Sequence, residues 1–275
     1  MAVERITCLD DPRLSDYATI REPELLRSHG VFIAESREVV RLLVTGHRFA
    51  VRSVLVTETA LVALADVWSN LDSRTPIFVA PRPIIESVVG YNVHRGCLAA
   101  GERPADMELA RLWEDARGLV LLPVLEGVSN PDNVGGIFRN ALAFGCPGVV
   151  LGPGCADPLY RKAIRVSVGA TLRLPFVVSE SWPRTLAELA GAGFTLVALT
   201  PERKATRLDA VSAGSLPTHR VALLMGSEGD GLSHETLDTV RRHVRIEIAT
   251  GVDSLNVATT SGIALHSFKR LLGGA

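Results

Sequence analysis

The chain has 275 residues, of which 47% are hydrophobic and 21% are charged, and its formal net charge is −1 at pH 7. This composition is typical of a globular protein and excludes an intrinsically disordered one, while the length predicts two domains. The near-neutral charge gives no support to a strongly basic nucleic-acid binder, although the basic residues are almost all arginines, whose bidentate fork suits phosphate.

The cellular compartment is indicated by what the sequence lacks. No apolar run reaches the roughly 18 residues of a membrane span. The first residues, MAVERITCLDD, carry acids where a secretory signal would be basic and then apolar. The four cysteines form no CxxC pair. We therefore expect a cytoplasmic protein with reduced thiols, no membrane contact and no metal site.

The first hundred residues predict a small α/β domain. The stretch VFIAESREVVRLLVTGHRFAVRSVLVTE, residues 31–58, is typical of a strand, a helix and a second strand, with Ser36 as the N-cap of the helix. Further strands are predicted at PIFVA, residues 76–80, and at CLAA, residues 97–100.

A linker and a second domain follow. Proline and charged residues in GERPADMELARLWEDARG interrupt the apolar pattern, so we place the first domain at residues 1–105, a linker at 106–118 and the second domain at 119–275. The second domain contains six short apolar runs: LVLLPVLEG, GVVLGPG, LRLPFVV, FTLVALT, VALLMG and VRIEIA. Such runs are typical of a mainly parallel sheet buried on both faces, which binds ligands at the carboxyl ends of its strands.

The first stretch whose residues could bind a ligand or take part in a reaction, EGVSNPDNVGGIFRNALAFG, follows the first of these runs. A helix is predicted to begin near Pro131. Arg139 lies beside Gly135 and Gly136 on this helix, and the missing side chains leave a flat surface that a bulky ligand could approach. The alternative is an exposed arginine, with the glycines serving close helix packing.

The second stretch, GSEGDGLS, follows VALLM. Its three glycines allow close approach of a ligand to the backbone, and Ser233 is a good N-cap for the next helix. Glu228 is either the partner of a basic group or an ordinary loop acid. The order is neither GxGxxG nor that of a P-loop, which opposes a dinucleotide-dependent oxidoreductase.

The third stretch, DSLNVATTSGIALHSF, links the last apolar run to a predicted helix. Ser254 and Asn256 stand at this junction, where small polar residues either cap a helix or hold a ligand. A separate segment, DPLYRKAIRVSVGA, places three basic residues on one helix face, which is either a cationic patch or an ordinary solvated surface.

Taken together, NPDNVGGIFRNALAFG, LLMGSEGDGLS and IEIATGVDSLNVATTSGIAL resemble the three motifs of the SpoU (TrmH-type) RNA methyltransferases of the SPOUT superfamily. FIAESREVVRLL and YNVHRGCLA are similar to the small L30e-like RNA-recognition domain that precedes many members. The resemblance implies an α/β fold in which a C-terminal SPOUT-type domain, with a mainly parallel sheet and a trefoil knot, follows an L30e-like α/β domain. It also implies a homodimer.

The resemblance implies an S-adenosylmethionine (SAM)-dependent RNA 2′-O-methyltransferase that acts on a ribose hydroxyl of structured RNA. Ribosomal RNA is favoured over transfer RNA because of the N-terminal domain. A catalytically inactive, knotted RNA-binding or assembly protein is the other alternative, because this chain has SLNVATT where the motif usually reads SLNVSVA. The proline–methionine pair that often follows the position of Ile246 is Glu247 and Ile248 here.

The matching positions supply the candidate residues. Those implied to be catalytic are Asn133, Arg139, Glu228, Ser254 and Asn256. Those implied to hold SAM are Leu199, Thr200, Gly226, Ile246 and Leu255. Basic residues that we expect to contact RNA are Arg37, Arg41, His94, Arg95, Arg161, Lys162 and Arg165.

Arg139 is expected to contact the target hydroxyl and its adjoining phosphate. Because a guanidinium keeps its proton in ordinary surroundings, we expect it to orient the hydroxyl and stabilise the developing alkoxide rather than act as the base. Glu228 is expected to orient Arg139.

Overall fold

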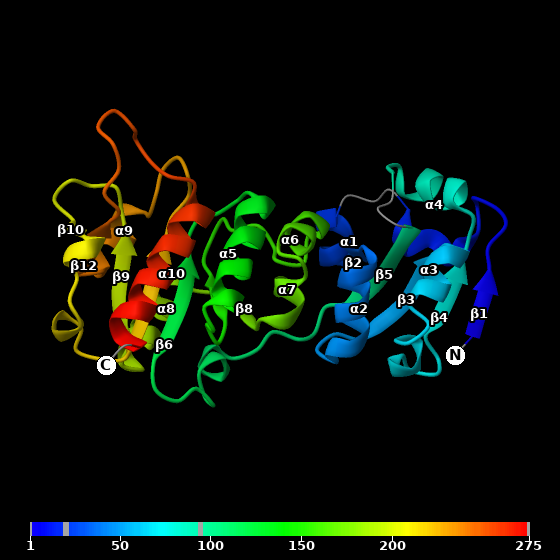
Figure 1. Cartoon of the computed structure of the whole chain (residues 1–275), viewed down its shortest axis with the longest axis horizontal. Helices are drawn as coiled ribbons and strands as arrows, with labels where there is room; N and C mark the ends of the chain where they lie inside the picture. Colours follow the sequence, from blue (N-terminus) through cyan, green and yellow to red (C-terminus); the bar gives the residue numbers. More distant parts are fainter. Residues whose placement is uncertain (1, 19–21, 93–95, 274–275) are drawn as a thin grey trace. The chain divides into compact units, whose positions relative to one another are not determined.

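The computed structural model describes residues 2–18, 22–92 and 96–273 (Figure 1). The chain divides into two compact units. The first contains Met1–Ala105 and Pro158–Arg173, and the second contains Asp106–Asp157 and Leu174–Ala275. The chain therefore passes from one unit to the other three times.

The first unit is built on a five-stranded sheet with the order β1-β4-β3-β5-β2. Its strands are β1 (Ala2–Arg5), β2 (Val31–Glu35), β3 (Val51–Val56), β4 (Pro76–Val79) and β5 (Cys97–Glu102). Strands β1, β4 and β3 are parallel, and β5 runs antiparallel to both of its neighbours. The carboxyl ends of β1, β4, β3 and β2 therefore lie at the same edge of the sheet.

Helices cover both faces of this sheet. They are α1 (Glu22–His29), α2 (Arg37–Gly46), α3 (Glu58–Ala63) and α4 (Arg82–Val89), together with α6 (Arg161–Val166) and α7 (Ala170–Arg173) from the later segment. Single 3-10 turns span Pro12–Tyr17 and Trp68–Asn70. Leu25 of α1 and Ile85 of α4 belong to one buried cluster with Leu55 of the sheet. The predicted strand–helix–strand order of residues 31–58 is confirmed.

The second unit is built on a seven-stranded sheet with the order β10-β12-β9-β11-β6-β7-β8, and all of its pairings are parallel. The strands are β6 (Val120–Leu125), β7 (Val149–Leu151), β8 (Phe176–Val178), β9 (Thr195–Leu199), β10 (Thr206–Arg207), β11 (Arg220–Met225) and β12 (Arg242–Arg245). The central strand β6 is buried along its whole length. Five of the six apolar runs thus contain strands of a parallel sheet, as the sequence predicts, whereas only Val244 and Arg245 of the run VRIEIA belong to β12.

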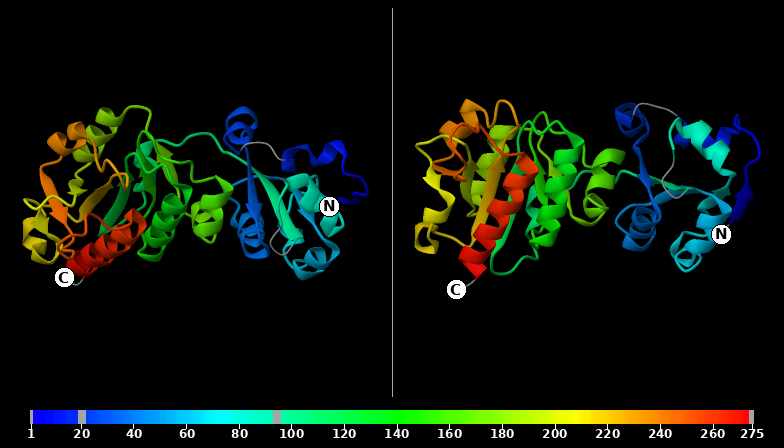
Figure 2. Two further views of the ribbon diagram at one scale, coloured as in Figure 1. Left: turned by 90° about the horizontal axis from the view of Figure 1, so that it is seen from above. Right: turned by 45° about the horizontal axis from the view of Figure 1, so that its top comes forward.

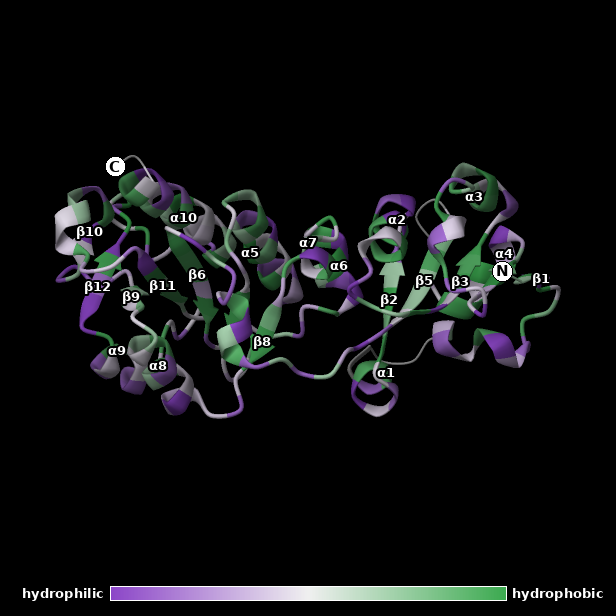
Figure 3. Ribbon diagram, turned by 90° about the horizontal axis from the view of Figure 1, so that it is seen from below, coloured by the Kyte–Doolittle hydropathy of each residue, from purple (hydrophilic) through white to green (hydrophobic). Residues whose placement is uncertain are grey.

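Two helices lie on each face of this sheet. They are α5 (Pro131–Ala143), α8 (Trp182–Gly191), α9 (His234–Thr239) and α10 (Val257–Gly273), and a 3-10 turn at Leu109–Leu112 precedes β6. Helices α5 and α10 lie side by side on one face, which both views of Figure 2 show, and α8 and α9 cover the other face (Figure 3). Apolar side chains of α8, including Leu186, pack against β6 and β11.

The contact between α5 and α10 depends on small side chains. A Cβ atom on Gly136 would lie 2.7 Å from the Cβ atom of Ala258, so the two helices meet at a distance that only glycine allows. The amide nitrogen of Asn140 donates hydrogen bonds to the carbonyl of Ala258 (2.8 Å) and to the hydroxyl of Ser261 (2.9 Å). Gly136 therefore serves close helix packing, the alternative raised by its sequence.

The helix N-caps follow the sequence signals at Ser36 and Ser233. The Ser36 hydroxyl accepts a hydrogen bond from the amide of Val39 (3.3 Å), and the Ser233 hydroxyl accepts one from the amide of Thr236 (3.2 Å). Ser36 has φ 89° and ψ 154°, a backbone conformation that is normally confined to glycine.

Membrane-spanning helices and disulfides are both absent from the described part of the chain. Within residues 2–18, 22–92 and 96–273, no helix combines the length and the apolar character needed to cross a bilayer. All four cysteines are free thiols, and burial raises the pKa of Cys97 and Cys146 to about 12, which makes both poor nucleophiles at neutral pH.

Candidate active site

A cavity of about 370 Å³ opens at the carboxyl ends of three adjacent strands of the seven-stranded sheet. These are β12, β9 and β11, which are neighbours in the strand order. The loops that follow them, together with the first turn of α10, form the walls. This is the edge at which parallel sheets bind ligands.

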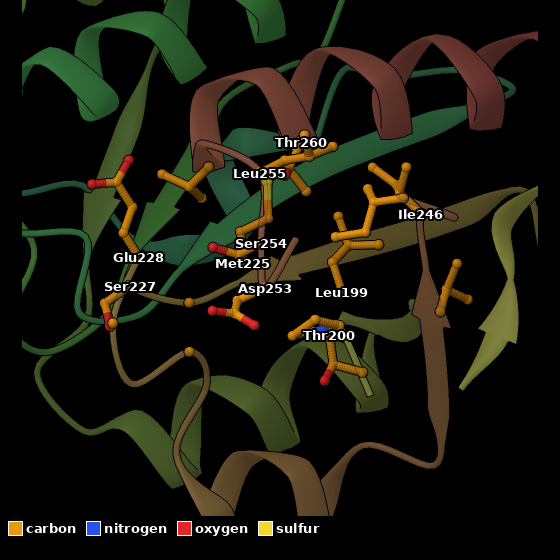
Figure 4. A pocket seen from close by; sticks show the side chains of 17 residues that line it. Leu199, Thr200, Met225, Ser227, Glu228, Ile246, Asp253, Ser254, Leu255 and Thr260 are labelled. Atoms are coloured by element: carbon orange, nitrogen blue, oxygen red, sulfur yellow. The ribbon is translucent and has the colours of Figure 1, made fainter. Parts of the chain in front are cut away.

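The walls are formed mostly by three loops (Figure 4). The residues lining the cavity are Leu199, Thr200, Pro201, Met225, Gly226, Ser227, Glu228, Gly229, Gly231, Val244, Ile246, Ile248, Asp253, Ser254, Leu255, Val257 and Thr260. All five residues predicted to hold SAM are among them. Glu228 and Ile246 lie at opposite ends of the cavity in Figure 4, so it has an acidic end and an apolar end.

At the start of the glycine-rich loop, the backbone at Gly226 lies close to the backbone of Gly231 and Leu232. A Cβ atom here would lie 2.0 Å from the carbonyl carbon of Gly231 and 2.2 Å from the amide nitrogen of Leu232. The amide of Ser227 donates to the carbonyl of Gly231 (3.1 Å), which closes the loop on itself. The cavity wall therefore requires glycine at position 226.

Asn256 joins the three motifs through one side chain. Its amide nitrogen donates to the Oδ1 atom of Asn133 on α5 (2.8 Å) and to the Oε1 atom of Glu228 (2.6 Å). Its Oδ1 atom accepts hydrogen bonds from the amides of Ala258 (3.0 Å) and Thr259 (3.1 Å) at the start of α10. The side chain thus caps α10, which is one of the two roles raised by the sequence, and it also links α5 to the glycine-rich loop. A role in holding a ligand stays a prediction.

Two variants of Asn256 separate these roles. Asn256→Ala removes both, and loss of the cap should lower the free energy of unfolding by about 1 kcal/mol. Asn256→Asp keeps a capping oxygen but replaces the donor with a carboxylate facing Glu228. If the link between the motifs matters for function, both variants should lose activity, while thermal unfolding shows the capping loss in the alanine variant alone. Normal activity of Asn256→Asp would contradict a role for the link.

The pairing of Glu228 differs from the expectation. Its carboxylate accepts the hydrogen bond from Asn256, and within the chain it does not orient Arg139. Arg139 is exposed on α5, lines neither this cavity nor the hollow beside it, and makes no hydrogen bond or ion pair with any residue the structure describes. The spacing of Arg139 and Glu228 in the sequence does not indicate whether their side chains meet in the fold.

A second hollow of about 580 Å³ lies beside the first and shares the wall formed by Ser227, Glu228 and Val257. Asn133, only 6% exposed, also lines this second hollow. The structure thus has two hollows with an amide–carboxylate link at their common wall, an arrangement that can hold a donor and an acceptor molecule side by side.

Glu126 is a residue that the sequence did not single out. It is 8% exposed at the end of β6, and its Oε2 atom accepts a hydrogen bond from the amide of Ser233 (3.2 Å). This contact ties the first motif to the end of the glycine-rich loop. One sequence feature could have identified Glu126: it directly follows a buried strand, at the edge of the sheet where ligands bind.

Ser254 does not cap α10. Its side chain lines the cavity and makes no hydrogen bond within the described part of the chain. Asp253 and Thr260 line the same cavity and were not predicted. Of the two residues that stand in place of the usual proline–methionine pair, Ile248 lines the cavity, whereas Glu247 accepts a hydrogen bond from the Arg245 guanidinium (2.5 Å).

The basic residues predicted to contact RNA have different surroundings. Arg161 is half-buried: its guanidinium lies 3.8 Å from the ring centroid of Tyr91, and its Nε atom lies 4.0 Å from the Oε2 atom of Glu35. This side chain therefore has an intramolecular role. Lys162 and Arg165, on the same helix, are exposed.

Of the remaining four, Arg37 and Arg41 are described. Arg41 forms a two-point ion pair with Asp66. Arg37 lines a cavity at the edge of the five-stranded sheet. His94 and Arg95 lie outside the described residues.

Comparisons with known proteins agree with this site. The model of the SpoU rRNA Methylase family matches residues 121–266. An uncharacterized tRNA/rRNA methyltransferase of Mycobacterium bovis is 38% identical over 266 residues, which cover 95% of this chain and 90% of the relative. The 23S rRNA (guanosine-2′-O-)-methyltransferase RlmB of Xanthomonas campestris is 31% identical over 70% of this chain and 76% of its own length.

The fold of the whole chain is also matched. The AdoMet-bound rRNA methyltransferase from Sinorhizobium meliloti superposes with a TM-score of 0.81 at 20% identity, covering 98% of both chains. The family model spans more than half of the chain, including all three motifs and the cavity they form. The chain belongs to the SpoU rRNA methylase family.

Proposed function

We propose that this protein methylates a ribose 2′-hydroxyl of ribosomal RNA, with SAM as the methyl donor. The observation that carries the proposal is the link from Asn133 through Asn256 to Glu228, which stands between two adjoining hollows. The names of the relatives support the reaction, since one of them is a guanosine-2′-O-methyltransferase of 23S rRNA.

The first cavity fits SAM by size and chemistry. Its volume of about 370 Å³ lies within the range of ligand pockets. Leu199, Ile246 and Leu255 offer an apolar wall for an adenine ring. The acidic end at Glu228 and Asp253 favours a cationic ligand, and the closed loop at Gly226 presents backbone groups at close range.

When bound, SAM supplies an electrophilic methyl group on a sulfonium, which becomes a neutral thioether after transfer. The protein must hold the attacking 2′-oxygen in line with that methyl group. Such positioning is worth about 7–11 kcal/mol when the geometry is good. In this proposal Asn133 and Ser254 hold the ribose and the donor, and Arg139 stabilises the oxygen as its proton leaves to solvent.

The proposal extends to the assembly. Because Arg139 has no partner among the described residues of its own chain, we propose a cytoplasmic homodimer in which Arg139 of one subunit serves the cavity of the other. We further propose that the C-terminal segment is knotted through the second unit and that the first unit, an L30e-like domain, selects the RNA.

Two measurements test this function. Calorimetry should detect SAM binding, and ribose methylation mapped in ribosomal RNA with and without the gene should differ at one nucleotide. Absence of SAM binding would favour an inactive RNA-binding protein. A methylation change confined to transfer RNA would redirect the substrate.

A further inference from the structure

A second candidate site lies entirely within the first unit. A cavity of about 610 Å³ opens at the edge of the five-stranded sheet where β1, β4 and β3 end. The residues lining it are Arg5, Ile6, Thr7, Arg37, Thr57, Glu58, Thr59, Val79, Ala80, Pro81, Arg82 and Gly96. Several of them directly follow strands, so the cavity occupies the ligand-binding edge of this sheet as well.

The charge of this cavity is unbalanced. Arg5, Arg37 and Arg82 line it, against Glu58 as the single acid. Three guanidinium groups around one hollow favour an anion, and their planar forks match the oxygens of a phosphate.

Two of these arginines form ion pairs that are exposed to solvent. Arg5 pairs with Glu58, and the two side chains are 69% and 55% exposed. Arg82 pairs with Glu86 at 2.7 Å, and its side chain is 57% exposed. Exposed pairs of this kind are worth about 0–1 kcal/mol. A phosphate that accepts two hydrogen bonds from a guanidinium can therefore replace the carboxylates at little cost in free energy.

The surroundings of Arg37 differ from those of Arg5 and Arg82. Its Nε atom is buried and has no hydrogen-bond partner within the described structure. The residue is the first of α2, whose helix dipole adds positive potential at this end. The strained backbone of Ser36 precedes it, and strain of this kind concentrates at functional sites.

The rest of the lining suits the other parts of a nucleotide. The hydroxyls of Thr7 and Thr59 can bond to a sugar or to phosphate oxygens, and the exposed ring of Pro81 offers an apolar contact for a base. The volume lies within the range of small-molecule pockets.

We infer that this cavity binds a phosphate-bearing nucleotide, either as part of an RNA chain or free. The RNA form of the inference rests on the substrate proposed above, and it gives the first unit a defined contact point. Deleting residues 1–105 is a poor test, because Pro158–Arg173 packs in the same unit and would be left without partners.

The test uses the full chain with the double variant Arg37→Gln/Arg82→Gln. The matched control is Arg74→Gln, in the same unit, with a side chain that is 89% exposed and does not line the cavity. Probes are a 23S rRNA transcript, followed by fluorescence anisotropy at several salt concentrations, and AMP and inorganic phosphate, followed by calorimetry. SAM affinity is measured on every variant.

We expect the double variant to bind the transcript at least tenfold more weakly, with a salt slope reduced by about one for each phosphate that is no longer neutralised. SAM affinity and the control should be unchanged. Loss of AMP and phosphate binding with unchanged RNA affinity would identify a free nucleotide as the ligand. Unchanged binding of all three probes would overturn the inference.

If the proposed function is wrong, the wild-type protein itself does not bind SAM. If only the present inference is wrong, the wild-type protein still binds SAM. If the double variant unfolds at a lower temperature than the control, the single variant Arg82→Gln carries the test, since its side chain is exposed. Arg82→Lys, which keeps the charge and loses the fork, should recover part of the RNA affinity.

Discussion

Gly226→Ala should weaken SAM binding by tenfold or more. The new Cβ atom would lie 2.0–2.3 Å from backbone atoms of Gly231 and Leu232, and no side-chain rotation can relieve a conflict with backbone. The loop must therefore move, and it forms a wall of the 370 Å³ cavity. Overpacking of this kind costs about 1–3 kcal/mol, and about 1.4 kcal/mol corresponds to a factor of ten in affinity. Calorimetry measures the loss directly.

The control for this variant is Gly191→Ala, at the end of α8. It adds the same methyl group where nothing lies within 4 Å, so SAM affinity should match the wild type. Wild-type affinity in Gly226→Ala would show that the glycine-rich loop does not form the donor site, and the assignment of the cavity would fall with it.

Arg139→Ala should reduce methylation by about 10²–10³-fold or more, the usual loss when one preorganised donor to a developing oxyanion is removed. SAM affinity should be unchanged, because Arg139 does not line the cavity of its own chain. Arg139→Lys keeps the charge but not the planar fork, so it should recover only part of the rate. The methylation rates of the wild type, Arg139→Ala and Arg139→Lys are measured under single-turnover conditions on the 23S rRNA transcript.

The same variant tests whether the site is shared between subunits. Arg139→Ala and Gly226→Ala, each impaired alone, should regain activity when mixed at a SAM concentration that leaves the Gly226→Ala cavity largely empty, if one subunit supplies Arg139 and the other the cavity. Absence of recovery in a demonstrated heterodimer would locate both parts in one chain. Near-normal turnover by Arg139→Ala alone would reject any role for this guanidinium in the chemistry.

Apolar patterning was sufficient to predict much of the fold. Buried runs such as VLLPVL gave the parallel strands, and Ser36 and Ser233 marked helix starts. Strand β10 was not predicted, because both of its residues are exposed and leave no apolar signal. The inclusion of Pro158–Arg173 in the first unit was not predicted either. That grouping depends on contacts between residues far apart in the chain, such as Gly169 with Leu42, which periodicity does not encode.

The candidate site was predictable in its members but not in its connections. Most of the residues predicted for the site line the cavity where β9, β11 and β12 end, Asn133 lines the adjoining hollow, and Asn256 is joined to them by hydrogen bonds, whereas Arg139 lines neither hollow. The hydrogen bond from Asn256 to Glu228 could not be predicted, because a residue type and its spacing indicate a capable side chain without naming its partner. The role of Glu126 was missed for the same reason.

The position of Asn256 at the start of α10 has a consequence for biosynthesis. Apart from Val257 and Thr260 in the first turn of α10, the lining of the cavity is translated before this residue, and α10 needs α5 and the sheet already in place as its docking surface. A nascent chain halted before residue 256 would therefore carry the strands and the glycine-rich loop without the crosslink between them. Catalytic competence should appear late and abruptly during synthesis, so that ribosomes engaged in making the enzyme are not exposed to a partly built, active form of it.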